Sequence, residues 1–243
     1  MRCWVYHTPE QVPEGDWPDC AVVVDVLRAT TTMAVALNAG ATAVQVFADL
    51  EELWRVSEQW PAEQRLRVGE RGGQVVSGFD MGNSPLDCTP DRVKGRRLFM
   101  STTNGTRALA RVQAAPCVLT CALVNRQAVA EFLRQHQPER VWVVASGWEG
   151  SFSLEDTACA GALLMGLGDQ VTTGNDEAVG ALALFRQWQE DLLGLLQRAS
   201  HGQRLLKLGQ GADLRFCAQL DCLTTIPVQT SLGLLTARAG GVL

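Results

Sequence analysis

The chain has 243 residues, of which 47% are hydrophobic and 19% are charged. This composition is typical of a soluble globular protein, and the length allows a substantial buried core. The 21 basic and 26 acidic residues leave a net charge of −5, which argues against the phosphate backbone of a nucleic acid as the partner.

The cysteines and the N-terminal sequence indicate a cytoplasmic protein. The eight cysteines are scattered through apolar sequence without a Cys-x-x-Cys motif, so we expect reduced and mostly buried thiols. Cys117 and Cys121 have no histidine close in sequence, and zinc is therefore not expected there. No basic region is followed by a long apolar core, and no apolar run approaches membrane-spanning length.

The most informative stretch follows a short predicted strand at Cys3–Tyr6. Ala21–Val24 is an apolar, β-branched run typical of a buried parallel strand, and residues 33–38 have the pattern of a helix that ends before Gly40. A carboxylate, a guanidinium and three hydroxyls lie between them: Asp25, Arg28, Thr30, Thr31 and Thr32. In an open α/β sheet ligands bind where strands end, and a helix start favours an anion. We expect a phosphate site with a divalent cation here, although Asp25 could also simply cap the helix.

A glycine-rich region from Gly69 to Pro85 follows a brief predicted strand at Leu66–Val68. Long irregular loops inside compact domains are usually functional or disordered, and the charged residues favour function here. The candidate site residues are Glu70, Arg71, Asp80, Asn83 and Ser84. Turn chemistry alone explains an aspartate in such a stretch, whereas Glu70 has less structural reason to be there.

A second strand, turn and helix repeats the first arrangement. Arg97–Ser101 is predicted to be a strand and Arg107–Val112 a helix. Asn104-Gly105 is also the strongest dipeptide signal for a two-residue hairpin, but a helical pattern follows it. We therefore expect an oxyanion or phosphate site at the helix start. Its candidate residues are Thr103, Asn104, Gly105 and Thr106.

Further strands are predicted at Val118–Ala122 and Val141–Ala145, with Asn125 as the cap of the helix between them. A helix over 154–167 begins after Ser153, whose spacing to Asp156 fits a capping box. Asp156 is thus either a cap residue or a residue of the site.

The last third of the chain is predicted to be mainly helical, with a helical pattern over 176–196 and a second one over 205–220 that Gly209 and Gly211 interrupt. Residues 226–229 are expected to form an edge strand, because Pro227 cannot donate to a ladder. Together these elements predict a single α/β domain over 1–243, with three α/β/α layers around a mostly parallel or mixed sheet.

The sequence lacks the residues that several classes of hydrolase and nucleotide-binding enzyme need. The histidines His7, His136 and His201 lie outside every polar cluster in the sequence, which argues against histidine-based hydrolysis. The residues after Val24 contain no Asp-x-Asp pair, so the common aspartyl-phosphatase arrangement is missing. The phosphate-binding loop of nucleotide enzymes, Gly-x-x-x-x-Gly-Lys-Ser/Thr, is also absent.

Five segments together resemble the 2-phosphosulfolactate phosphatase family (ComB), in order and at matching spacing between about residues 20 and 230. The segments are residues 25–32, 69–73, 78–85, 101–106 and 153–156. The resemblance implies magnesium-dependent hydrolysis of (R)-2-phospho-3-sulfolactate to 3-sulfolactate and phosphate, a step of coenzyme M biosynthesis. It also implies an α/β/α fold unrelated to that of the common phosphatases.

This chemistry agrees with the residues. A phosphosulfolactate carries phosphate, sulfonate and carboxylate groups, for which Arg28, Arg71, two helix N-termini and Mg²⁺ would supply positive charge. The candidate Mg²⁺ ligands are Asp25, Glu70 and Asp156, with Asp80 in reserve. Asp25 could alternatively attack phosphorus itself.

Two other function classes are compatible with a metal beside an anion. The first is a non-catalytic binder of small organic phosphates, and the second is a lyase or isomerase acting on a phosphorylated hydroxyacid. The expected partner in every case is a small anionic phosphomonoester, with no nucleic acid and no membrane. The chain could act as a monomer or as a homo-oligomer.

Overall fold

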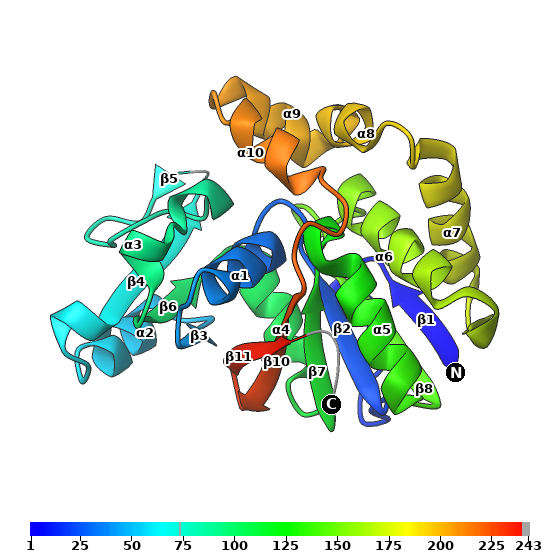
Figure 1. Cartoon of the computed structure of the whole chain (residues 1–243), viewed down its shortest axis with the longest axis horizontal. Helices are drawn as coiled ribbons and strands as arrows, with labels where there is room; N and C mark the ends of the chain where they lie inside the picture. Colours follow the sequence, from blue (N-terminus) through cyan, green and yellow to red (C-terminus); the bar gives the residue numbers. More distant parts are fainter. Residues whose placement is uncertain (73, 240–243) are drawn as a thin grey trace.

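Apolar, β-branched runs build one mixed sheet, and helices cover both of its faces (Figure 1). The structure is a computed structural model that describes residues 1–72 and 74–239. The described strands are β1 (Arg2–Tyr6), β2 (Cys20–Val24), β3 (Ala43–Val46), β4 (Arg65–Arg71), β5 (Gln74–Val75), β6 (Arg97–Ser101), β7 (Cys117–Cys121), β8 (Arg140–Ala145), β9 (Thr172–Thr173), β10 (Thr225–Ser231) and β11 (Leu234–Ala239). This arrangement confirms the three-layer α/β/α prediction.

The helices alternate with strands in the first two thirds of the chain and follow one another in the last third. They are α1 (Ala29–Asn38), α2 (Leu50–Ser57), α3 (Pro90–Val93), α4 (Gly105–Val112), α5 (Arg126–His136), α6 (Leu154–Leu167), α7 (Asp176–Trp188), α8 (Leu192–Arg198), α9 (Ser200–Lys207) and α10 (Gly211–Cys217). None of the helices in the described residues is long and apolar enough to cross a membrane.

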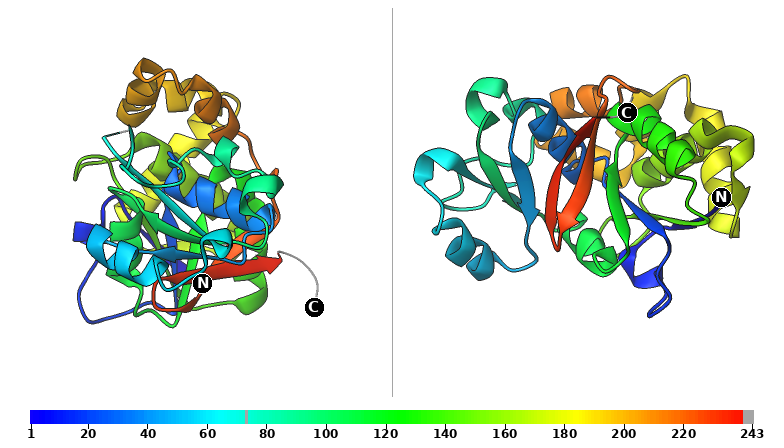
Figure 2. Two further views of the ribbon diagram at one scale, coloured as in Figure 1. Left: turned by 90° about the vertical axis from the view of Figure 1, so that its left-hand side faces the viewer. Right: turned by 60° about the horizontal axis from the view of Figure 1, so that its bottom comes forward.

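The strand order is β5-β4-β6-β3-β11-β10-β7-β2-β8-β1-β9. Strands β4, β6 and β3 form one parallel group, and β7, β2, β8 and β1 form another. The antiparallel hairpin β10–β11 stands between the groups, shown in red in Figure 2. The chain crosses from the second group to the first through α1 and returns through α4.

The joint between the two groups is sparsely paired. β11 pairs with β3 at Leu234↔Gln45 and Leu235↔Val44, and β10 pairs with β7 at Val228↔Leu119. Three successive antiparallel pairings, β3–β11, β11–β10 and β10–β7, separate the two groups. The strands of one group therefore run in the opposite direction to those of the other. The loops that follow β2 and β6 nevertheless line one pocket, which is described below.

The central strand β2 is buried over its whole length, as the apolar run predicts. Val22 and Val24 pack in a core with residues of α5 and α6, whereas Ala21 and Val23 pack in a core with residues of α1 and α4. Both faces of β2 are therefore covered, which explains why its sequence is continuously apolar rather than alternating.

Three sequence predictions differ from the structure. The strand containing Pro227 is internal rather than at an edge, and within the described residues its pairing with β7 is limited to Val228↔Leu119. The helix predicted over 176–196 is two helices, α7 and α8, and the second begins at a cap formed by Asp191. Strand β4 extends to Arg71, so Glu70 and Arg71 lie in a strand rather than in a loop; Gly73 of that motif is outside the described residues.

Helices α6 and α7 approach each other closely at Gly161. A Cβ atom at this position would lie 1.9 Å from the backbone oxygen of Ala181. We expect Gly161→Ala to lower the melting temperature, because separating the helices costs about 1–3 kcal/mol. Gly180→Ala, on α7 with open space around the added atom, is the control and should keep or raise the melting temperature. Equal melting of Gly161→Ala and wild type would contradict this helix contact.

Candidate active site

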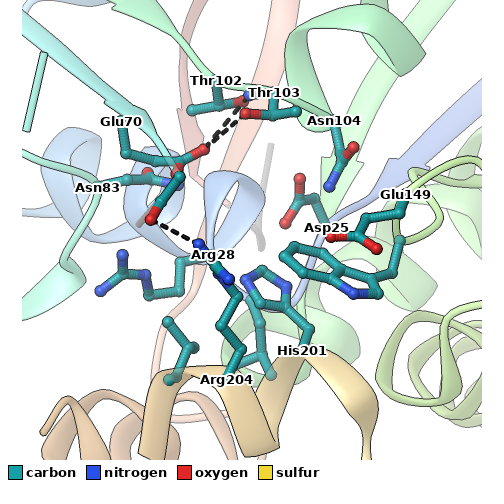
Figure 3. A pocket seen from close by; sticks show the side chains of 14 residues that line it. Asp25, Arg28, Glu70, Asn83, Thr102, Thr103, Asn104, Glu149, His201 and Arg204 are labelled. Atoms are coloured by element: carbon teal, nitrogen blue, oxygen red, sulfur yellow. Dashed lines mark hydrogen bonds between the residues drawn. The ribbon is translucent and has the colours of Figure 1, made fainter. Parts of the chain in front are cut away.

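A pocket lies where the loops after β2, β4, β6 and β8 meet helix α9 (Figure 3). Most of its lining residues are polar or charged, and the lining comprises Asp25, Leu27, Arg28, Glu70, Gly72, Asn83, Thr102, Thr103, Asn104, Trp148, Glu149, His201, Arg204 and Leu205. Both parallel groups of strands contribute to it. The pocket therefore lies at the crossover point of the sheet, where the chain passes from one group of strands to the other. Open α/β sheets commonly bind ligands at such a point.

Asp25 follows β2 directly, and its carboxylate is held between the starts of two helices. Oδ1 accepts a hydrogen bond from the Ala29 N–H at 3.1 Å, and the Gly105 N–H also donates to this carboxylate. A Cβ atom on Gly105 would lie 2.7 Å from Asp25 Oδ2 and 2.5 Å from the Ala29 side chain. Glycine is thus needed at the start of α4 so that the turn can approach Asp25.

The three threonines after Arg28 lie in the first turn of α1 and support the backbone. Thr30 Oγ1 donates to the Asp25 and Cys121 carbonyls, Thr31 Oγ1 donates to the Val26 carbonyl, and Thr32 Oγ1 donates to the Asn83 carbonyl. The three side chains are buried and are not among the residues that line the pocket. Their hydroxyls fix the loop that carries Asp25 and Asn83, instead of facing a ligand as the sequence had suggested.

The turn after β6 leads into helix α4, which excludes the hairpin alternative for Asn104-Gly105. Thr103 and Asn104 line the pocket, and Thr103 Oγ1 donates to Glu70 Oε1 at 3.1 Å. Thr106 is buried and its hydroxyl donates to the Thr102 carbonyl at 2.7 Å, where it closes the first turn of the helix.

Some residues of the glycine-rich region line the pocket, and others lie behind its lining. Glu70 and Asn83 line the pocket. The Arg71 guanidinium instead donates to the Ser101 hydroxyl and carbonyl behind the turn, at 2.9 and 3.3 Å. Asp80 accepts the Arg67 N–H and is not among the lining residues.

Two buried polar atoms of the pocket lining have no hydrogen-bond partner among the described residues. They are Asn83 Oδ1 and Thr102 Oγ1. Buried polar groups are rarely left unpaired in native proteins. These atoms therefore mark places where a ligand or water completes the site.

The last third of the chain supplies groups that sequence reasoning missed. Arg28 forms a buried ion pair with Asp213 of α10, and the Ser84 hydroxyl donates to the other carboxylate oxygen of Asp213 at 2.8 Å. His201 and Arg204 enter the pocket from α9. In sequence these residues look like the solvated face of amphipathic helices, and nothing in their spacing separates them from surface charges.

Trp148 and Glu149 were also missed, although a signal for them exists. They lie in the loop that leaves the carboxyl end of β8, after Ser146 and Gly147, so the rule that ligands bind at strand ends points to this loop as well. The Trp148 ring stacks on the His201 ring, with centroids 3.9 Å apart and planes inclined by 19°. The stacked pair forms one wall of the pocket.

Three buried carboxyl groups lie close enough to influence one another. Burial raises the pKa of Asp25 to about 6, and the charge of Glu70 adds to the rise. Burial likewise raises the pKa of Glu155 to about 7, with a contribution from Asp25. Burial and the charges of Glu155 and Asp25 raise the pKa of Asp156 well above its usual value. Negative charge is therefore costly here unless a cation offsets it.

His201 is neutral at physiological pH. Burial lowers its pKa to about 3, and the positive charges of Arg28 and Arg204 contribute to the decrease. The His201 ring can thus take part in hydrogen bonds but adds no positive charge to the pocket. The guanidinium groups of Arg28 and Arg204 are the cationic groups of the lining.

The predicted metal ligands occupy different positions. Asp25 and Glu70 line the pocket, whereas Asp156 Oδ1 accepts the Val26 N–H at 2.8 Å behind it. The Asp156 N–H faces Ser153 Oγ at 3.4 Å, so the predicted cap at Ser153 is present. Over residues 1–72 and 74–239, no three His, Cys, Asp or Glu side chains form a ready-made metal cluster.

This donor set still fits a hydrated Mg²⁺ ion. Mg²⁺ prefers one or two carboxylates, with waters and substrate phosphates as its remaining ligands. Of the three carboxylates in the lining, Asp25 and Glu70 are the predicted ligands, and Asn83 Oδ1 adds an oxygen that has no partner among the described residues. A cation would also offset the charge of the buried carboxyl groups.

The chain is similar to proteins of one family over nearly its whole length. Residues 6–231 match the family model described as 2-phosphosulpholactate phosphatase. A protein of Thermosynechococcus vestitus is 64% identical over 97% of this chain and 99% of its own length. Proteins of Trichormus variabilis and a Picosynechococcus species are 58% and 59% identical over 98% of this chain, and over 100% and 99% of their own lengths.

All three relatives are named probable 2-phosphosulfolactate phosphatase. The match covers most of the chain and includes all five segments on which the sequence resemblance rests. The chain therefore belongs to the 2-phosphosulfolactate phosphatase family.

Proposed function

We propose that this protein hydrolyses (R)-2-phospho-3-sulfolactate, or a closely related 2-phospho-hydroxyacid, to the hydroxyacid and phosphate, with Mg²⁺ as cofactor. The buried Asp25 carboxylate at the crossover point of the sheet is the observation that carries this proposal. Family membership supports the reaction, and the charge of the pocket supports the cofactor.

The charge argument compares the acidic and basic groups of the lining. Asp25, Glu70 and Glu149 oppose Arg28 and Arg204, and Asp213 already pairs with Arg28. A substrate with three anionic groups would meet a pocket with excess negative charge. A divalent cation resolves this conflict, because it attracts both the carboxylates and the phosphate.

In the proposed reaction Asp25 and Glu70 would hold Mg²⁺, and Asn83 Oδ1 would be a further oxygen ligand. A bound Mg²⁺ would supply positive charge for the phosphoryl oxygens and would make water a better nucleophile. The N-terminal turn of α4, with Thr103 and Asn104, positions the phosphate next to Asp25. Asp25 accepts hydrogen bonds from two backbone N–H groups. We therefore assign Asp25 the role of holding the cation, and we assign water the role of the nucleophile that attacks phosphorus.

The first prediction is phosphate release from (R)-2-phospho-3-sulfolactate by the purified protein. We expect turnover with Mg²⁺ and its loss with a chelator, because the carboxylates alone repel the substrate. A colorimetric phosphate assay measures the rate, and NMR identifies the carbon product. Uptake of the ester without turnover would instead indicate a binder, and a product that keeps its phosphate would indicate a lyase or isomerase.

The second prediction compares two buried aspartates. Asp25→Asn should lower kcat by at least about 100-fold, since metal-ion catalysis contributes several kcal/mol. Asp156→Asn keeps an oxygen for the Val26 N–H and should retain most of the activity with an unchanged Mg²⁺ requirement. Mg²⁺ titrations of both variants, with thermal melts, measure these effects. A sharply raised Mg²⁺ requirement in Asp156→Asn would make Asp156 a ligand.

The third prediction concerns stability and pH. Asp25 and Glu155 have pKa values of about 6 and 7 in the folded protein, above those of the unfolded chain. The folded state therefore binds protons more tightly, and stability falls as pH rises toward about 7. With chelator present, the melting temperature should decrease between about pH 5 and 7.5. Added Mg²⁺ should reduce this decrease, and a flat profile in chelator would contradict the carboxylate repulsion.

A further inference from the structure

Arg204 enters the pocket on the side opposite to the turn that carries Thr103 and Asn104 (Figure 3). Its Nη2 atom donates a hydrogen bond to the Gly72 carbonyl at 2.7 Å. Within the described part of the chain, no carboxylate forms an ion pair with this guanidinium. Arg204 therefore brings to the pocket a positive charge that forms no ion pair with any of the described carboxylates.

Arg28, the other guanidinium of the lining, differs in this respect. Its Nη1 atom is paired with Asp213, and both side chains are almost fully buried, at 4% and 6% exposure. The second oxygen of Asp213 accepts the Ser84 hydroxyl. An anion that approaches Arg28 meets a neutral pair, whereas one that approaches Arg204 meets a net positive charge. Charge-assisted, bidentate hydrogen bonding to an anion is thus favoured at Arg204.

The position of Arg204 is fixed by the packing of its helix. A Cβ atom on Gly202 would lie 1.7 Å from the Leu196 backbone oxygen and 3.5 Å from the Leu214 side chain. Helix α9 therefore lies directly against α8 and α10. Leu205 is 1% exposed and anchors the next position. A guanidinium on such a packed helix is held in place for recognition.

We propose that Arg204 binds the sulfonate of the phosphomonoester substrate and determines specificity for a second, remote anionic group. This inference rests on the proposed function. In 2-phospho-3-sulfolactate the carboxylate is attached to the carbon that carries the phosphate, whereas the sulfonate is one carbon further away. With the phosphate at Asp25 and the α4 turn, the remote group is the one directed to the opposite wall. The planar guanidinium suits two oxygens of a sulfonate.

The test compares two substrates that differ in the sulfonate, 2-phospho-3-sulfolactate and 2-phospholactate. Arg204→Gln should lower kcat/KM for the sulfonated substrate by about 10- to 100-fold, as expected for a lost hydrogen bond to a charged group. The value for 2-phospholactate should change by less than about threefold. Arg204→Lys, which keeps the charge and loses the planar fork, should fall between Arg204→Gln and wild type.

Lys207→Gln is the matched control, because it removes one positive charge from the same helix at an exposed position outside the pocket lining. It should leave both kcat/KM values unchanged. Calorimetric titration with 3-sulfolactate, in the presence of Mg²⁺, gives a second readout that needs no turnover. We expect Arg204→Gln to weaken this binding by a similar factor and Lys207→Gln to leave it unchanged.

Equal losses on the two substrates would overturn the inference, because Arg204 would then act only through its contact with Gly72. Unchanged selectivity in Arg204→Gln would overturn it as well. Failure of the wild-type protein to release phosphate from either ester would contradict the proposed function. The calorimetric comparison would in that case still decide whether Arg204 binds the sulfonate.

Discussion

The ion pair between Arg28 and Asp213 connects the two parts of the chain on which the site depends. Arg28 belongs to the loop after the central strand, and Asp213 belongs to a helix 185 residues further along the sequence. Both charges are buried, so losing one partner would leave the other unpaired at a cost of about 3–5 kcal/mol. The pair holds α10 against the carboxyl end of β2, and α9, packed beside α10, carries His201 and Arg204 into the pocket. One electrostatic contact therefore connects the wall that carries the acids to the wall that carries Arg204.

The same strand end concentrates negative charge that the protein does not neutralise by itself. Asp25, Glu155 and Asp156 are buried together, and each has a raised pKa because of burial and the neighbouring charges. Such an arrangement opposes folding at neutral pH, since ionised groups lose hydration and repel one another. Sites of catalysis commonly retain arrangements that are unfavourable for stability. A divalent cation at Asp25 would relieve the repulsion, which links the proposed cofactor to stability as well as to chemistry.

Local patterns predicted the parts of this structure that depend on local physics. The continuously apolar run of β2, the helix start at Ser153 and the strand, turn and helix around Asn104 all follow from burial and capping preferences. Such local patterns could not predict which distant segments of the chain contact one another. The position of Asp213 depends on how the three short helices α8, α9 and α10 pack on one another, and the internal position of Pro227 depends on the pairing of β10 with two other strands. The threonines after Arg28 were predicted as ligand donors, and in the structure their hydroxyls bond to backbone carbonyls, as hydroxyls in a first helical turn readily do.

The architecture also explains how one site can combine a reaction centre with selectivity. Residues that hold the reacting group come from loops at strand ends, where the sheet fixes the backbone of Asp25 and Thr103. Arg204 comes from a helix of the last third, which packs on neighbouring helices and reaches the pocket from the opposite side. Because the two sets belong to different elements, the proposed reaction centre at Asp25 and the proposed selectivity of Arg204 depend on different segments of the chain. The buried Arg28–Asp213 ion pair joins these segments, so a substitution on the surface of α9 should affect selectivity before it affects the position of Asp25.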